Sequence, residues 1–336
     1  GKYAFYGCDK LRKISLGVGL KTIEEGAFYN CQNLEPLALP NTLNVIAAKA
    51  FQYCNRFTDI TIPDAVNNIS PAAFDDCINL KSITVSEKNP TFSSSDGVLL
   101  NKTGQLLIRC PQGRKRDYQV PATVTEISTA AFYRCSALTS ITIPDGVITI
   151  RNDAFRECSS LGTVNIPQAL TTMGSFAFAS CESLESVIVP AGVTSIGSFA
   201  FHDCKNLKSV GLSAKVASIG NNAFDGCAAL TGLALPAKLT SIGSNAFQGC
   251  TGLSSLTLPA RLSAIGKAAF RQCVSLKELN VPDLVTTIQD TIDLSTLFFD
   301  VVTNLLCAFT LSQNIQQEVF ELANPTTNVL NRNPHV

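Results

Sequence analysis

The dipeptide Ala-Phe recurs along this chain at a fixed interval, and this repetition constrains the fold more than any other feature. Consecutive copies are equally spaced, except for one much longer step from Phe74 to Phe132. Such regularity predicts a solenoid, in which each repeat forms one coil and buries its apolar side chains against the neighbouring coils. The repeated phenylalanines are Phe5, Phe28, Phe51, Phe74, Phe132, Phe155, Phe178, Phe201, Phe224, Phe247 and Phe270.

The repeating 23-residue unit reads L-x-x-I-x-I-P-x-x-V-x-x-I-G-x-x-A-F-x-x-C-x-x. In Ile-x-Ile the period of two predicts a short strand with both isoleucines on one face, and the following proline ends that strand. The spacing of Gly-x-x-Ala-Phe-x-x-Cys predicts one short helical turn. The unit therefore predicts a right-handed solenoid of about 11–12 repeats, with a parallel sheet on one side and helical turns on the other.

The same set of Ile-Pro, Ile-Gly, Ala-Phe and Cys, in this spacing over residues 1–288, resembles the BspA-like leucine-rich repeats, also called Treponema pallidum-type repeats. The resemblance implies a leucine-rich-repeat solenoid without a cofactor. It also implies a cell-surface or secreted protein that mediates adhesion or recognition. The implied partner is a protein or glycan of a host or of a neighbouring cell.

Two segments depart from the repeat, which occupies residues 1–85 and 120–288. Residues 86–119 form an insert, in which Val98–Leu100, a turn at 101–104 and residues 105–111 predict a β-hairpin. In residues 289–336 apolar side chains recur at steps of three and four, which predicts a helical cap or tail over the open end of the solenoid. A membrane-surface helix and a self-association seam are the alternatives for this tail. The absence of Lys and Arg from residues 289–331 argues against a membrane helix.

The chemistry-bearing residues favour a binding protein over an enzyme. Of 13 cysteines, eleven follow a repeat phenylalanine by three residues, so we expect a ladder of reduced, buried thiols. The two histidines, His202 and His335, support no metal cluster and no Ser-His-Asp arrangement. We therefore expect no catalytic, cofactor-binding or metal-binding residues. Balanced charges, 26 basic against 26 acidic, argue against a nucleic-acid partner, and no apolar run is long enough to span a membrane.

The predicted binding surface is the concave face of the sheet, where the residues flanking the inner isoleucine point outward. The candidates on this face are Lys13, Ser15, Asp59, Thr61, Ser82, Thr84, Ser140, Thr142, Thr163, Asn165, Ser186, Ser255, Thr257, Glu278 and Asn280. A second candidate is the basic cluster Arg114, Lys115 and Arg116, which could bind an acidic partner.

An intracellular interaction scaffold or self-assembly module is the alternative function. The ladder of free thiols would suit a reducing compartment. The apolar tail would then be the seam through which copies of the chain associate.

Overall fold

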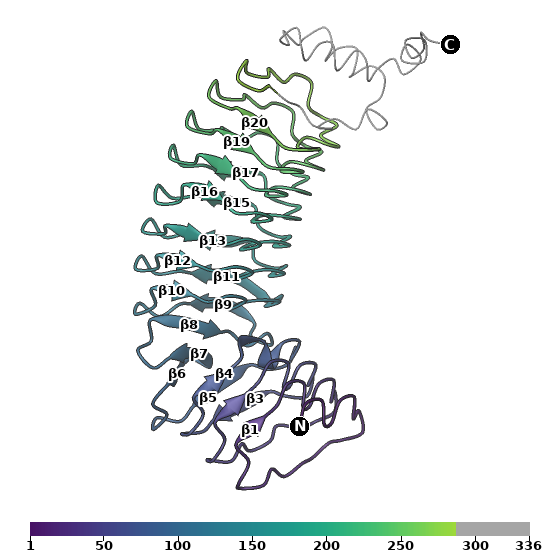
Figure 1. Ribbon diagram of the computed structural model, residues 1–336, viewed down its shortest axis with the longest axis vertical. Coiled ribbons are helices and arrows are strands. Elements are labelled where there is room, and N and C mark those ends of the chain that lie inside the picture. Colours follow the sequence, from purple (N-terminus) through teal and green to yellow (C-terminus); the bar gives the residue numbers. More distant parts are fainter. Residues whose placement is uncertain (287–336) are drawn as a thin grey trace, which may run out of the picture.

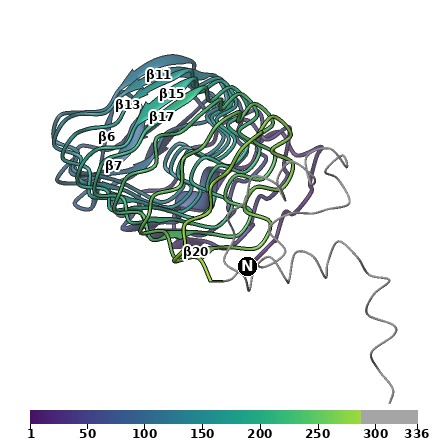
Figure 2. The same cartoon turned by 90° about the horizontal axis from the view of Figure 1, so that it is seen from above.

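The computed structural model describes residues 1–286, which form a solenoid of about 11 coils stacked along one axis (Figure 1). Equivalent residues of neighbouring repeats pair with each other: Ile23 pairs with Ile46, and Ile219 pairs with Ile242. Seen from above, the coils lie over one another, so equivalent residues form rows along the solenoid (Figure 2). The tail expected over residues 289–336 lies outside the described residues.

The first side of each coil is built from the Ile-x-Ile segment, and we call its solvent-facing surface the outer face. Its strands are β3 (Asp59–Ile62), β5 (Ser82–Val85), β9 (Arg116–Gln119), β11 (Leu138–Thr142), β13 (Thr163–Asn165), β15 (Ser186–Ile188) and β17 (Ser209–Gly211). The strands pair in parallel, with Ile60 opposite Ile83 and Ile141 opposite Val164. Ile60, Ile83 and Ile141 are buried, as the alternating pattern predicts.

The second side consists of two-residue strands that end at the second repeat isoleucine, or at Met173 in β14, and a glycine follows this residue in five of them. They are β1 (Thr22–Ile23), β2 (Val45–Ile46), β4 (Asn68–Ile69), β10 (Glu126–Ile127), β12 (Thr149–Ile150), β14 (Thr172–Met173), β16 (Ser195–Ile196), β18 (Ser218–Ile219), β19 (Ser241–Ile242) and β20 (Ala264–Ile265). Adjacent members within each sheet pair in parallel. The glycine allows close stacking here, because a Cβ on Gly243 would lie 2.5 Å from the backbone nitrogen of Asn221 in the preceding coil.

The third side carries the Ala-Phe segments, and here the predicted helical turns are wrong. Among the described residues only η1 (Pro71–Phe74) is a short 3-10 helix. Elsewhere the backbone adopts left-handed conformations on either side of the phenylalanine. Around Phe247, Asn245 has φ +55° and Gly249 has φ +68°. A chain that visits the left-handed region at such positions cannot continue a helix. Instead, the Phe247 amide donates to the Ala269 carbonyl of the next coil at 2.8 Å.

Phenylalanine rings and cysteine thiols fill the core below this third side. Neighbouring rings stack, as for Phe201 and Phe224, whose centroids are 5.5 Å apart with planes inclined by 6°. Each inner thiol donates to a carbonyl of the preceding coil, as Cys204 does to Phe178 at 3.1 Å. Cys8, however, is exposed, so the prediction that all eleven ladder thiols are buried is wrong for this residue. Cys8 belongs to the first coil of the described residues.

The insert contains three antiparallel strands, β6 (Phe92–Ser95), β7 (Val98–Asn101) and β8 (Leu106–Arg109). The sequence predicts the hairpin of β7 and β8, and β6 is an additional strand that this prediction does not include. A tight turn joins β6 to β7, and Gly97 adopts φ +74° there. Because β8 also pairs in parallel with β10, the last part of the insert continues the second side of the solenoid.

The insert interrupts the row of phenylalanines. The Cys110 amide donates to the Ala131 carbonyl at 2.7 Å, the same contact that the Phe132 amide makes with Ala154 one coil later. A cysteine therefore stands in the row between Phe74 and Phe132. The buried apolar residues accordingly form two clusters, one within residues 23–108 and one within residues 98–285.

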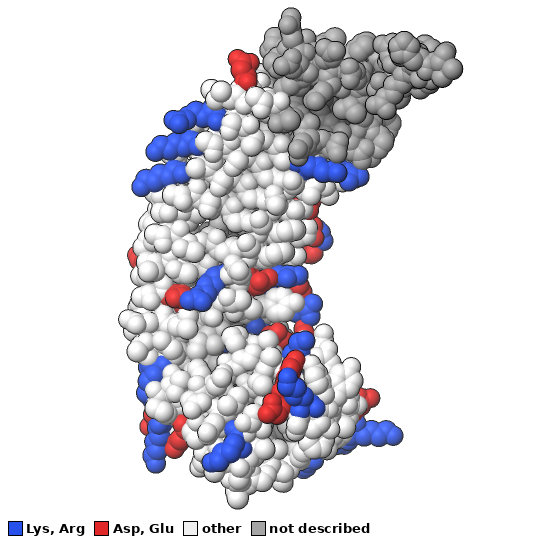
Figure 3. Space-filling model, viewed as in Figure 1, with Lys and Arg blue, Asp and Glu red and all other residues white. Residues whose placement is uncertain are grey.

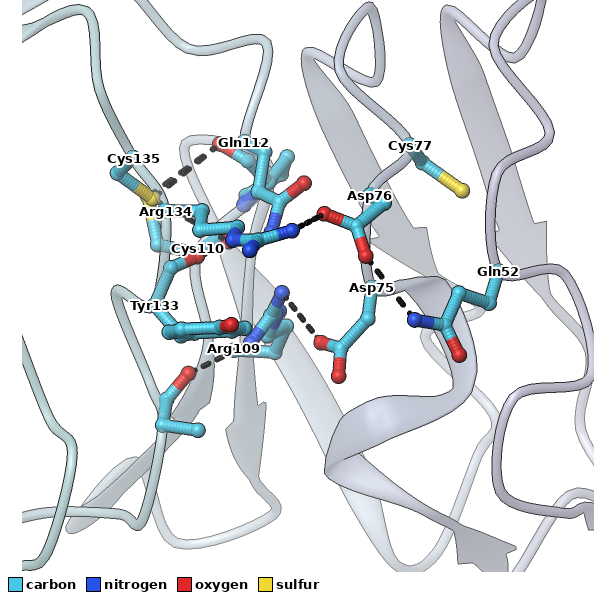
Figure 4. Close-up of polar contacts among 12 residues, drawn as sticks. Gln52, Asp75, Asp76, Cys77, Arg109, Cys110, Gln112, Tyr133, Arg134 and Cys135 are labelled. Carbon is cyan, nitrogen blue, oxygen red and sulfur yellow. Dashed lines mark hydrogen bonds and ion pairs between the residues drawn. The ribbon is translucent and has the colours of Figure 1, made fainter. Parts of the chain in front are cut away.

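Polar side chains join the two clusters where the aromatic row is broken (Figure 4). Arg109, whose side chain is 1% exposed, forms an ion pair with Asp75 at 2.7 Å and donates to the Ala130 carbonyl at 2.6 Å. Arg134 pairs with Asp76 at 2.6 Å, and Gln52 donates to the same carboxylate. Charged groups here replace the apolar stacking found elsewhere in the solenoid.

Candidate binding surface

The outer face presents two rows of side chains that run along the solenoid, one on each side of the inner isoleucine. The strand register aligns them: Asp59 lies opposite Ser82, and Thr61 lies opposite Thr84. The predicted residues all reach solvent, Ser82 and Ser140 being half-exposed and the others exposed. Whether they contact a ligand stays a prediction.

The outer face is held rigidly by the packing beneath it. Thr142 pairs in register with both Gln119 and Asn165 in neighbouring coils, while Ile141 is buried next to it. Hydroxyls also bond across coils, as the Thr61 and Thr84 oxygens do at 2.9 Å. Short polar side chains on a fixed backbone lose little conformational entropy when a ligand binds.

Two shallow, open grooves cross the outer face. The N-terminal groove, of about 620 Å³, lies between the segments 36–41 and 59–64 and is also lined by Ser86 and Lys88. The C-terminal groove, of about 520 Å³, lies between the segments 232–237 and 255–260. The first includes two carboxylates, Asp59 and Asp64, whereas the second contains no charged side chain in its lining.

Small residues in the outward rows account for the grooves. Ala38 and Ala234 occupy the positions that Thr61 and Thr257 fill in the following coils. Each alanine lines its groove, where a larger side chain would fill the space. Sequence reasoning missed these positions because it selected side chains able to make polar contacts. An alanine interrupting a row of threonines was the available signal.

The outward row also becomes apolar ahead of the C-terminal groove. Ile188, whose side chain is 70% exposed, lies in register with Gly211, and Ala234 follows one coil later. The surface next to the C-terminal groove, on the side of the preceding coils, is therefore apolar.

The basic cluster predicted at residues 114–116 is not a patch of three free cations. Arg114 forms an ion pair with Asp96 and lies over the Tyr118 ring, with its guanidinium carbon 4.6 Å from the ring centroid. It therefore fastens the β6–β7 turn to β9. Lys115 and Arg116 remain exposed.

The described histidine makes charged contacts on the third side of the coils. His202 is half-buried, and its ring nitrogens lie 3.4 Å from an Asp203 carboxylate oxygen and 3.3 Å from one of Asp225. The close contact with the Asp225 carboxylate is the main cause that raises the pKa of His202, while burial opposes it. The sequence did not indicate this cluster, because Asp225 lies one coil away.

Neither a metal cluster nor a spanning helix is found within residues 1–286. No group of three or more His, Cys, Asp and Glu side chains in that range is placed to hold a metal ion. No helix there has the length and hydropathy needed to cross a membrane.

Comparison with solved structures identifies bacterial relatives of this fold. A leucine-rich repeat protein from Eubacterium ventriosum aligns with a TM-score of 0.75 at 23% identity, covering 87% of this chain and 83% of that one. A leucine-rich cell surface protein from Faecalibacterium prausnitzii aligns with a TM-score of 0.56 at 28% identity, covering 76% and 68%. A leucine-rich repeat protein from Bacteroides ovatus has 26% identity and a TM-score of 0.50, covering 89% and 80%.

No protein with a curated functional description matches the chain significantly. The model of the BspA type leucine-rich repeat region, however, matches residues 1–96, 115–227 and 171–293. These matches span most of the solenoid and agree with the 23-residue register of its coils. The chain belongs to the family of BspA-type leucine-rich repeat proteins.

Proposed function

We propose that this chain is a non-catalytic recognition protein, located on the cell surface or secreted, that holds a macromolecular ligand against its outer face. The observation that carries the proposal is the outer face, on which two rows of solvent-facing side chains are crossed by two open grooves within the described residues. Solenoids commonly use such extended surfaces for binding.

The location rests on the family and on one neighbour. The Faecalibacterium prausnitzii protein with 28% identity is described as a cell surface protein. Membership in the BspA-type repeat family supports the same placement. The proposed ligand is a protein or glycan of a host or of a neighbouring cell.

The composition of the outer face favours many weak contacts over one tight pocket. Tight interfaces are usually anchored by Trp, Tyr and Arg, whereas the chain has no Trp and its predicted surface residues are mainly Ser, Thr and Asn. Repeated weak contacts along a rigid row gain strength from multivalency. An extended ligand spanning several coils fits this surface best.

The test is binding of the purified chain to a panel of extracellular matrix proteins and cell-surface glycans. A variant carrying Thr142→Arg and Asn165→Arg adds bulk at two adjacent outward positions. The matched control carries Ser136→Arg and Asn206→Arg, both exposed outside the outer face. We expect the first variant to lose binding and the control to retain it. Equal binding by both variants, or no binding by the unmodified chain to any member of the panel, would refute the proposal.

A further inference from the structure

Three basic residues form a row at the C-terminal end of the described solenoid. Lys215, Lys238 and Arg261 occupy the same position in three consecutive repeats and are exposed, and we call them the basic ladder. The strands that follow keep them aligned, since Ser218 pairs with Ser241 and Ser241 with Ala264. Their backbones are therefore about 5 Å apart, the spacing of neighbouring strands.

Some exposed lysines elsewhere in the solenoid lie opposite a partner of the other sign in the neighbouring coil. Across one coil, Lys205 pairs with Glu182 at 2.7 Å and Lys208 pairs with Glu185 at 3.1 Å. Within residues 1–286, no member of the basic ladder forms an ion pair. Figure 3 shows basic side chains in a row level with β19 and β20, without an acidic side chain between them. Like charges at this spacing repel, so the ladder does not stabilise the fold.

The basic ladder borders the C-terminal groove. Ala237 and Ala260 line that groove, and each is followed directly by a ladder residue, Lys238 and Arg261. The groove also exposes Ser255 and Thr257, whose hydroxyls can donate and accept hydrogen bonds. The row of cations thus passes the end of an open groove that carries hydroxyl groups.

We propose that the basic ladder and the C-terminal groove together bind an acidic polysaccharide, whose sulfates or carboxylates face the three cations. This inference rests on the proposed function and specifies one class of ligand for it. A linear polysaccharide repeats its charges at regular intervals along an extended chain, as the ladder repeats along the solenoid. A pyranose chain advances by roughly one strand spacing per ring, which matches one ring to one coil. Its hydroxyls would bond with Ser255 and Thr257.

Other anionic polymers fit these residues less well. Single-stranded nucleic acids bind through aromatic platforms, and no aromatic side chain lines the groove. Attraction to anionic lipids usually takes clusters of four to eight basic residues, and the ladder has three. An extended acidic peptide places side chains of one face about 7 Å apart, which is wider than the ladder spacing.

The experiment measures binding of the purified chain to heparin, as a sulfated probe, and to polygalacturonate, as a carboxylated probe. The ladder variant carries Lys215→Gln, Lys238→Gln and Arg261→Gln. The control variant carries Lys81→Gln, Lys205→Gln and Lys208→Gln, which removes the same charge from other exposed positions. We expect the ladder variant to bind at least one probe about tenfold or more weakly, with a flatter salt dependence, and the control to stay close to the unmodified chain. Sulfated and carboxylated sources are distinguished by which probe responds.

A second pair of variants tests the groove without changing charge. Ala234→Phe fills the C-terminal groove, and Ala38→Phe fills the N-terminal groove as its control. The proposal expects weaker polysaccharide binding only for Ala234→Phe, and equal effects of the two would overturn the assignment of the groove.

The proposal as a whole is overturned by three results. The first is that the chain binds neither polysaccharide. The second is that the ladder and control variants lose polysaccharide binding equally. The third is that the ladder residues support stronger binding to polyglutamate, single-stranded DNA or anionic vesicles than to either polysaccharide. In each case, retained binding of a matrix protein through Thr142 and Asn165 would leave the proposed function standing.

Discussion

Arg109 and Asp75 come from opposite sides of the break in the phenylalanine row and form an ion pair at 2.7 Å. Burial raises the pKa of the Asp75 carboxyl, and the positive charge of Arg109 opposes that shift. The pair, the Arg109 contact with Ala130 and the Arg134–Asp76 ion pair link the two core clusters (Figure 4).

Replacing Arg109 with methionine should destabilise the chain by about 3–5 kcal/mol, because it leaves a buried carboxylate without its partner. Adding Asp75→Leu should recover part of that loss. Chemical denaturation gives the free energies of unfolding. The control is Lys205→Met at an exposed ion pair, which should have a much smaller effect on stability. An Arg109→Met cost no larger than the control would contradict a supporting role for the buried pair.

Cys8 should react with iodoacetamide in the native state much faster than the inner ladder cysteines. It is exposed, whereas burial raises the pKa of Cys31 to about 11 and that of Cys204 to about 12. Because the thiolate is the reactive form, buried thiols should react only when the coils open. Peptide mass spectrometry after timed labelling checks this. Labelling of Cys204 at the rate of Cys8 would show that the inner coils open readily.

Gly243→Ala should destabilise the solenoid by about 1–3 kcal/mol, because the new methyl group would meet the backbone of the preceding coil. Its Cβ would lie 2.5 Å from the Asn221 nitrogen. Gly146→Ala is the matched control, since the nearest atom to its Cβ is 3.8 Å away. Thermal or chemical denaturation should place the control within about 0.5 kcal/mol of the unmodified chain. Similar losses at both positions would mean that close coil stacking is not the reason for the glycine.

The contribution of His202 to stability should depend on pH. Its folded pKa is raised, chiefly by the close contact with the Asp225 carboxylate, so the folded state favours the protonated ring. The stabilisation is fully present below the unfolded pKa, near 6.5, and is lost as the pH rises through the folded value. The pair is partly solvent-exposed, so the effect should stay below about 1 kcal/mol.

Comparing His202→Gln with the unmodified chain by denaturation at acidic and alkaline pH measures this difference. The stability gap should be wider at pH 5.5 than at pH 9. A gap that widens toward alkaline pH would contradict the assigned contact with Asp225.

The sequence was sufficient to predict the coil register and most of the core. Phenylalanine, cysteine and isoleucine recur in phase because every coil repeats the same contacts, so spacing alone indicates which side chains face inward. The prediction of helical turns was wrong because the spacing of Ala-Phe and Cys does not determine the sign of the backbone φ angles. Residues such as Asn245 and Gln272 adopt positive φ, and the Asn245 amide is held there by a hydrogen bond to the next coil.

The missed features depend on contacts between distant residues. Nothing in the local sequence shows that Arg109 is buried, since its partner Asp75 lies in the coil before the insert. The grooves escaped notice for a different reason. They arise where Ala38 and Ala234 are small, and a hollow is a property of two neighbouring coils together.

The constant length of the repeat also bears on how proteins of this kind can change in size. Each coil contacts only its neighbours, so gain or loss of one whole unit between Phe132 and Phe270 would leave the remaining rows aligned. Duplication of the coding sequence for one unit would extend the outer face by one coil, whereas an insertion of another size would interrupt the rows, as the insert at residues 86–119 does. The length of the surface available to a ligand could therefore evolve by duplication of coils, without a change in the packing that keeps each coil folded.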